Sequence, residues 1–139
     1  MYQVQHKPET LSEPRDELAS RMLAMPSHTN PMGNIFGGWI MSVMDAAALM
    51  TATKIANGTV VTVAVSNMAF LEPVRVGDAI CCYTDVSAIG ATSITLSVEV
   101  WVLRQGQGDR TKVTAAEFKF VALNDNGCPR PVVAQPDGA

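Results

Sequence analysis

An aspartate lies inside an apolar segment that begins at a pair of glycines. From Trp39 to Met50 the sequence reads WIMSVMDAAALM, in which only Ser42 and Asp45 carry polar side chains. An ionised carboxylate is costly to bury unless it is paired or hydrogen-bonded. Asp45 is therefore a candidate functional carboxylate. The alternatives are that it faces solvent or satisfies neighbouring backbone groups in a helix interface.

The glycine pair, Gly37 and Gly38, opens this segment. Glycine serves in tight turns and where a helix packs closely on a strand, which is one explanation of the pair. The other is that the missing side chains let a ligand approach the free N–H groups of the first helical turn, where the helix dipole favours negative charge. An oxyanion would be stabilised at such a position.

The spacing of Gly38 and Asp45 has a consequence for assembly. They lie about two turns apart at 3.6 residues per turn, so they share one helix face, yet about 10 Å separates them along the axis. A single carbonyl group cannot contact both. If two such helices pack antiparallel across a twofold axis, Asp45 of one subunit approaches Gly38 of the other, which gives two equivalent sites. This geometry predicts an obligate dimer.

Asn30 lies in the loop that leads to the glycines. This loop, from Pro26 to Phe36, is rich in proline, glycine and small polar residues, which are typical of turns. The amide of Asn30 can orient a water molecule or a carbonyl oxygen. Asparagine is also common in turns for conformational reasons alone, so both interpretations stay open.

Other familiar site types are not indicated. His28 is the only histidine near the glycines, but no G-x-S-x-G nucleophile motif accompanies it, and the other histidine, His6, lies in the polar N-terminal region. The two histidines and three scattered cysteines lack the spacing of metal ligands. No phosphate loop or dinucleotide-binding motif is present. The sequence predicts neither a metal nor another cofactor.

The composition is typical of one compact domain, and its N-terminal region and thiols favour the cytoplasm. The chain has 139 residues, of which 47% are hydrophobic and 17% charged, and no apolar run reaches the roughly 18 residues of a membrane span. A net charge of -3 without a basic cluster gives no indication of nucleic-acid binding. The polar N-terminal region resembles neither a secretory signal nor a transit peptide. Three thiols, two of them adjacent at Cys81 and Cys82, favour a reducing compartment.

The elements that position these residues follow from hydrophobic spacing. Residues 1–17 are expected to be a poorly ordered lead-in, and the following LASRMLAMP suits either a short helix or a first strand. Helical spacing runs from Gly38 to about Ala56, where Asn57 and Gly58 form a stop signal. Four strand-like segments follow: TVVTVAVSNMAFL, DAICCYTDVSAI, TSITLSVEVWVL and TKVTAAEFKFVAL.

The strands indicate an antiparallel sheet with one buried face. Ile94, Leu96, Val98 and Val100 alternate with more polar residues, as expected when only one face of a sheet is covered. One helix packed on that face makes an α+β domain in which the sheet wraps the helix. Because the helix is apolar nearly all round, it needs a second cover, and a partner subunit is the natural one.

A set of motifs extends over nearly the whole chain. They are Thr29-Asn30, Gly33, Phe36-Gly37-Gly38 and Asp45, followed by VVTVAVSNMAFLEPVRVGD, CCY and VEVWV. These motifs closely resemble those of the hotdog-fold acyl-CoA thioesterases, especially the bacterial YciA-type branch. The resemblance covers residues 18–133 and leaves 134–139 as a tail.

The resemblance implies a fold, an assembly and a reaction. The implied fold is the hotdog fold, a long central helix wrapped by an antiparallel sheet, in dimers that commonly assemble into hexamers. The implied reaction is hydrolysis of an acyl-CoA thioester to free CoA and a carboxylic acid. Asp45 would act as general base or nucleophile, with Asn30 as its amide partner from the opposite subunit. The N–H of Gly38 would polarise the thioester carbonyl.

The resemblance also implies residues that bind the substrate, with two departures from the family pattern. Ile89 before Gly90, and Cys128, stand where relatives often carry a basic residue, so positive charge that would contact the CoA phosphates is missing. We therefore expect a different affinity or substrate range. The implied substrate-binding residues are Gly37, Gly90, Thr92, Ser93 and Arg130.

Two other functions remain open from the sequence. A non-catalytic acyl-CoA binding or regulatory module on the same fold would keep the pocket but would need no acid at Asp45. A structural oligomer, in which the glycines and the acid serve only subunit packing, would have no affinity for CoA.

Overall fold

The computed structural model describes residues 17–104, 106 and 108–133. The proposed lead-in and tail, apart from Glu17, lie outside the described residues. Glu17 itself is the first residue of the first strand. The elements are β1 (Glu17–Leu23), a short 3-10 helix (Pro26–His28), α1 (Gly37–Ala56), β2 (Val60–Phe70), β3 (Ala79–Ile89), β4 (Ser93–Leu103) and β5 (Arg110–Ala122).

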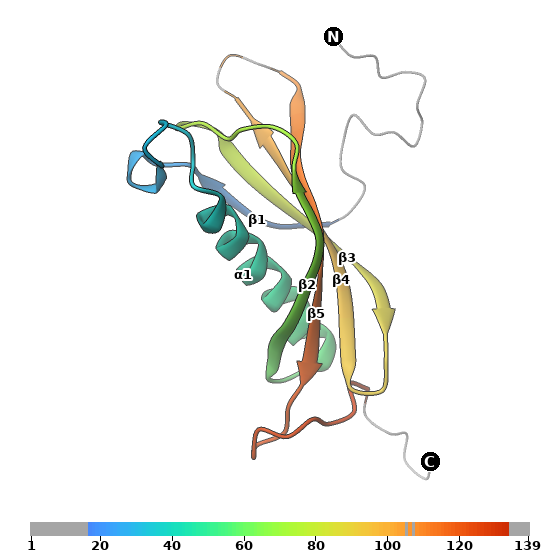
Figure 1. Ribbon diagram of the computed structural model, residues 1–139. Helices are drawn as coiled ribbons and strands as arrows, with labels where there is room; N and C mark the ends of the chain where they lie inside the picture. Colours follow the sequence, from blue (N-terminus) through green and yellow to red (C-terminus); the bar gives the residue numbers. More distant parts are fainter. Residues whose placement is uncertain (1–16, 105, 107, 134–139) are drawn as a thin grey trace.

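The five strands form one antiparallel sheet in the order β1-β3-β4-β5-β2. The long helix α1 lies along one face of this sheet (Figure 1). The segment that the sequence left undecided between helix and strand is β1, which pairs with β3. The predicted α+β architecture, one long helix on an antiparallel sheet, is confirmed.

Helix α1 ends where its sequence signals a stop. Asn57 adopts the left-handed conformation with φ 55° and ψ 46°, and its N–H donates to the carbonyl of Thr53. Asparagine tolerates this conformation better than most residues, so the helix terminates without strain. At the other end the helix begins at Gly37, one residue earlier than predicted.

The main core fills the space between α1 and the sheet. The alternating residues Ile94, Leu96, Val98 and Val100 of β4 are all fully buried in it, as their pattern predicts. The facing helix residues are mostly small, which lets the helix approach the sheet closely. The buried residues of α1 are Ile40, Val43, Met44, Ala47, Ala48, Ala52 and Ala56.

A second, smaller cluster lies on the opposite face of the sheet. It consists of Cys81, Tyr83 and Trp101. Cys82, the next residue of β3, belongs instead to the main core. The two adjacent thiols therefore point to opposite faces, as strand geometry predicts, and both are free.

Apolar side chains remain exposed on α1 and on the edge strand β2. On the helix these are Met41, Leu49 and Met50, and on β2 they are Val61, Val63, Val65 and Phe70. Among the described strands, β2 ends the sheet, so one of its sides has no strand partner there. A long apolar edge strand is a surface that natural proteins normally protect. No helix in the described part of the chain is long and apolar enough to cross a membrane.

Candidate active site

The first turn of α1 presents two peptide N–H groups that have no acceptor among the described residues. The N–H groups of Trp39 and Ile40 both donate to the carbonyl of Phe36, at 3.1 and 3.3 Å. Those of Gly37 and Gly38 make no such bond, and no side chain caps the helix. Free N–H groups at a helix start favour an anionic ligand.

The backbone conformation does not require glycine at either position. Neither Gly37 nor Gly38 has a positive φ angle. A Cβ atom on Gly37 would lie 3.6 Å from the ring of Phe70, and one on Gly38 would lie 3.4 Å from the ring of Phe36. Both distances are in the van der Waals range, so close packing does not exclude a side chain. The glycine pair is better explained by access to the free N–H groups.

Two cavities adjoin the glycines on different sides. The first, of about 310 Å³, touches Gly37, and the second, of about 470 Å³, touches Gly38. The first is lined mainly by Ile35, Ile40, Phe70, Leu71 and Val74. The second is lined by Ser27, His28, Thr29, Phe36 and Trp39.

Asn30 is fixed by a tight turn that engages one half of its amide. Its Oδ1 accepts hydrogen bonds from the N–H groups of Met32 and Asn34, at 2.9 and 3.1 Å. Gly33 permits the turn with φ 86°. Because the carbonyl half is engaged, the amide NH2 group is the half that remains to donate to a ligand. Asn30 is therefore a turn residue and a candidate donor at once.

Asp45 is half-buried on α1 and faces the edge strand. Its Oδ1 accepts a hydrogen bond of 2.7 Å from the hydroxyl of Thr62 on β2. The carboxylate therefore bonds to a side chain, not to the neighbouring backbone groups that the sequence left as an alternative. Thr62 was not among the predicted site residues. A polar residue within the apolar run VVTVAV was an indication that its hydroxyl contacts another polar group.

The residues expected to bind the rest of the substrate gather near the C-terminal end of α1. The N–H of Gly90 donates to the carbonyl of Ser93 at 2.8 Å, and the carbonyl of Thr92 accepts from the N–H of Ala122 at 2.9 Å. The N–H of Arg130 donates to the carbonyl of Ala122, also at 2.9 Å. Since α1 has 20 residues, its two ends are about 30 Å apart.

The guanidinium of Arg130 is bound by three backbone carbonyls. Its Nε donates to Leu123 at 3.0 Å, its Nη1 to Pro131 at 3.0 Å and its Nη2 to Ala56 at 2.9 Å. Ala56 is the last residue of α1, where the helix dipole favours a cation. Arg130 thus stabilises the helix C-terminus, a role that the sequence reasoning did not assign to it.

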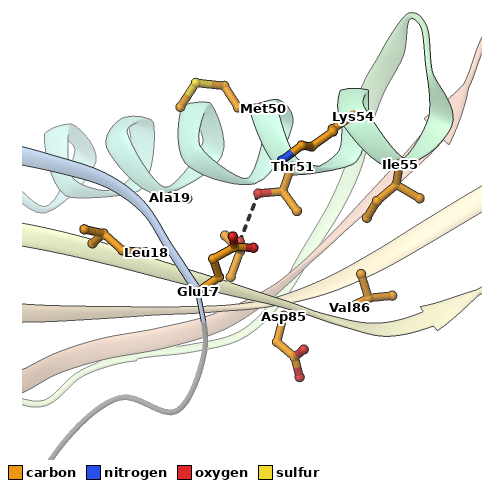
Figure 2. A pocket seen from close by; sticks show the side chains of 10 residues that line it. Glu17, Leu18, Ala19, Met50, Thr51, Lys54, Ile55, Asp85 and Val86 are labelled. Atoms are coloured by element: carbon orange, nitrogen blue, oxygen red, sulfur yellow. Dashed lines mark hydrogen bonds between the residues drawn. The ribbon is translucent and has the colours of Figure 1, made fainter.

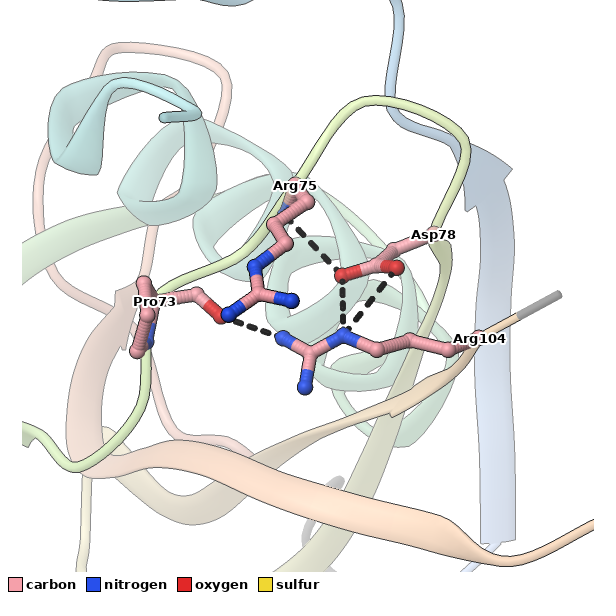
Figure 3. Close-up of polar contacts among 4 residues, drawn as sticks. All are labelled: Pro73, Arg75, Asp78 and Arg104. Atoms are coloured by element: carbon pink, nitrogen blue, oxygen red, sulfur yellow. Dashed lines mark hydrogen bonds and ion pairs between the residues drawn. The ribbon is translucent and has the colours of Figure 1, made fainter. Parts of the chain in front are cut away.

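An ion pair with a buried carboxylate holds the β2–β3 loop that lines the cavity beside Gly37. The guanidinium of Arg104 lies 3.1 Å from the carboxylate of Asp78 and also donates to the carbonyl of Pro73 (Figure 3). The adjacent carbonyl of Val74 accepts from the N–H of Ile35 at 2.8 Å. These contacts tie the loop to the segment that enters α1.

His28 lies in the second cavity, although the sequence reasoning set it aside. Its ring stacks on that of Trp39, with centroids 4.1 Å apart and an angle of 15° between the planes. Its Nδ1 accepts a hydrogen bond of 3.4 Å from the N–H of Met25. The spacing in the sequence gave no sign of this stack, because it depends on how the loop folds back on the helix.

A third cavity, of about 600 Å³, lies between the C-terminal half of α1 and strands β1 and β3 (Figure 2). The hydroxyls of Thr51 and Thr84 meet there at 2.9 Å. None of the predicted site residues lines this cavity. Among the residues that the structure describes, no group of three His, Cys, Asp or Glu side chains is arranged to hold a metal ion.

Comparison with known proteins gives the family. Residues 32–108 match the model of the thioesterase superfamily. The acyl-CoA thioester hydrolase YciA of Salmonella typhimurium is 49% identical over 125 residues, which are 88% of this chain and 94% of that protein. The chain belongs to the thioesterase superfamily.

Solved structures of other thioesterases confirm the hotdog fold. HI0827, described as a hexameric broad specificity acyl-coenzyme A thioesterase, is 46% identical with a TM-score of 0.84; the match covers 88% of this chain and 90% of that one. A hexameric hotdog fold thioesterase of Campylobacter jejuni is 39% identical with a TM-score of 0.79, over 84% and 90% of the two chains.

Proposed function

We propose that this thioesterase hydrolyses acyl-CoA to free CoA and a carboxylic acid, without a cofactor. The observation that carries the proposal is the arrangement on α1. Free N–H groups open its first turn and a half-buried carboxylate follows about two turns later. The high identity to a protein named acyl-CoA thioester hydrolase supports the choice of substrate.

Each residue then has a chemical role. The N–H of Gly38 donates to the thioester oxygen, which becomes an oxyanion when the carbonyl carbon is attacked. The free NH2 group of Asn30 is a further donor from the same loop and helix start. Asp45 removes a proton from the attacking water, or attacks the carbon itself. The C–S bond then breaks and CoA leaves as the thiolate. Where Asp45 has attacked the carbon directly, water then hydrolyses the mixed anhydride, which releases the carboxylic acid and restores Asp45.

Two subunits are needed to complete this site. In one subunit about 10 Å of helix separates Asp45 from Gly38, so they cannot act on one carbonyl. An antiparallel partner helix brings its own Asp45 to these glycines. Since Asp45 bonds to Thr62, it lies on the side of β2, one of the two edge strands of the described sheet. Pairing of two β2 strands would cover this edge and the exposed valines.

The same arrangement explains why the substrate-binding residues lie far from the glycines of their own subunit. In an antiparallel pair, the C-terminal end of one helix extends past the N-terminal end of the other. Gly90, Thr92, Ser93 and Arg130 of one subunit would then lie beyond Gly38 of its partner, where the CoA portion of the substrate would extend.

We propose that three such dimers form a hexamer in the cytoplasm. The solved relatives HI0827 and the Campylobacter jejuni protein are both described as hexameric. The three free thiols, Cys81, Cys82 and Cys128, support a reducing compartment. Light scattering of the purified protein would measure the assembly directly, and a monomer would contradict both the hexamer and the shared site.

The reaction is tested by mixing the protein with several acyl-CoAs and a thiol-detecting reagent. Release of CoA supports the proposed activity. Binding without release would indicate a regulatory module, and neither would indicate a structural oligomer. Asp45→Ala should lose most turnover, by about 1,000-fold or more, while its assembly stays intact. Unchanged hydrolysis by this variant would end the assignment of Asp45 as the catalytic carboxylate.

A further inference from the structure

The helix start lies between two cavities of different chemistry. Gly37 and Gly38 are successive helical residues, so their outward directions differ by about 100°. A Cβ atom on Gly37 would point toward the ring of Phe70, and one on Gly38 would point toward the ring of Phe36. Under the proposed function, these N–H groups bind the oxygen of the thioester. The acyl chain and the thiol chain are the two other substituents of the carbonyl carbon, and they extend from it in different directions.

The cavity beside Gly37 has the chemistry of an acyl site. Ile35 and Val74 are buried, and the side chains of Phe70 and Leu71 are exposed to solvent. Glu72 is the only ionisable residue among those that line it. An apolar chain that displaces water from these side chains gains free energy in proportion to the area covered.

The cavity beside Gly38 offers polar groups and a flat aromatic wall. Ser27 and Thr29 bring hydroxyls to it, and the stacked rings of His28 and Trp39 form one side. Because Nδ1 of His28 accepts from the N–H of Met25, the proton of the neutral ring lies on Nε2. That N–H is a donor without a hydrogen-bond acceptor among the described residues. Such a lining suits a chain that carries amides.

We propose that the acyl chain occupies the cavity of Phe70 and Gly37 and that the pantetheine arm of CoA occupies the cavity of His28 and Gly38. This assignment rests on the proposed function and makes it more specific. Phe70 then limits the acyl chains that fit. His28 binds the second amide or the hydroxyl of the pantetheine arm, groups that N-acetylcysteamine lacks, while Trp39 holds the imidazole in place.

Two variants and two series of substrates test the assignment. Phe70→Ala enlarges the first cavity, and His28→Leu removes the donor of the second while keeping its bulk. Leu71→Ala serves as a second variant of the first cavity, because Leu71 is exposed and its loss spares the core. Val86→Ala, in the third cavity, is the matched control. The acyl series runs from acetyl- to palmitoyl-CoA, and the thiol series compares butyryl-pantetheine with butyryl-N-acetylcysteamine.

The expected result is that each variant changes one series only. Phe70→Ala should change the kcat/KM ratio of long to short acyl chains by about 10-fold or more, since each methylene contributes a factor of that order in an apolar pocket. His28→Leu should lower the ratio of the pantetheine to the N-acetylcysteamine thioester about fivefold, as expected for one hydrogen bond. Val86→Ala should alter neither ratio.

Several results would overturn the assignment. If His28→Leu changed the acyl series and Phe70→Ala the thiol series, the two arms would be exchanged. If Phe70→Ala and Leu71→Ala both left the acyl series unchanged, or if Val86→Ala shifted it, the first cavity would not hold the acyl chain. A wild-type protein that hydrolyses none of the thioesters would instead refute the proposed function itself, which keeps the two failures distinct.

Discussion

The hydroxyl of Thr62 donates a 2.7 Å hydrogen bond to the carboxylate of Asp45 and turns it toward the edge strand β2. This contact holds the carboxylate beside the edge strand, about 10 Å along the helix from the glycines of the same subunit. It also joins the proposed catalytic acid to the strand through which we propose that subunits pair. The contact therefore links the position of the acid to the assembly.

Loss of this contact should impair turnover more than binding. In Thr62→Val the side chain keeps its shape but cannot donate, so Asp45 is free to rotate. We expect kcat to fall about 10-fold or more, as for the loss of one hydrogen bond to a charged group, with KM for acyl-CoA within about twofold. Steady-state kinetics measure both constants. Thr53→Val, at an exposed position of α1, is the control. Equal kcat values for Thr62→Val and the wild type would rule out a positioning role.

Arg130 should contribute to stability and to binding in separable ways. Its guanidinium has five N–H donors, of which three are used by carbonyls; two remain for a phosphate. In Arg130→Ala we expect a loss of about 1–3 kcal/mol of stability, because the end of α1 loses its partner. We also expect a higher KM for acyl-CoA but an unchanged KM for the same acyl-pantetheine, which lacks the nucleotide phosphates. A KM that rises equally for both thioesters would show that Arg130 acts only through the fold.

Much of the fold could be predicted because its signals are local. The helix from Gly37 to Ala56 follows from its apolar spacing and from Asn57, which ends it in the left-handed conformation. The buried face of β4 follows from alternation. The segment of β1 could not be assigned, because seven residues are too few for periodicity and its conformation depends on pairing with β3.

The site was only partly predictable, because several of its contacts are tertiary. Asp45 and the glycines differ from their neighbours in the sequence and can be recognised there. Thr62 lies among other β-branched residues, and only the packing of β2 against α1 brings its hydroxyl to Asp45. His28 meets Trp39 only after the loop folds back. The hydrogen bonds of Arg130 depend on carbonyls from the end of α1 and from the C-terminal segment, which no spacing rule connects.

Alkaline pH should weaken the fold through Cys82. Burial raises the pKa of this thiol to about 11 from its ordinary value of 9.0. Between these values the thiol of the unfolded chain has lost its proton while that of the folded chain retains it. The contribution of Cys82 to the free energy of unfolding is therefore fully present below pH 9 and is lost as the pH rises toward 11. Urea unfolding at several pH values should show a decline steeper by about 1 kcal/mol per pH unit for the wild type than for Cys82→Ala. Cys128→Ser, at an exposed thiol, should keep the wild-type slope.

Mixed subunits provide the most direct test of the shared site. If a site takes Asn30 and Gly38 from one subunit and Asp45 from its partner, Asn30→Ala and Asp45→Ala subunits are each inactive alone, but a hybrid dimer keeps one complete site. An equal mixture after free exchange is half hybrids with one of two sites intact, so it should regain about one quarter of wild-type activity. Native mass spectrometry of differently tagged subunits confirms the exchange. Proven exchange without any recovery would mean that Asn30 and Asp45 act within the same chain, because only a site divided between chains can be restored by mixing.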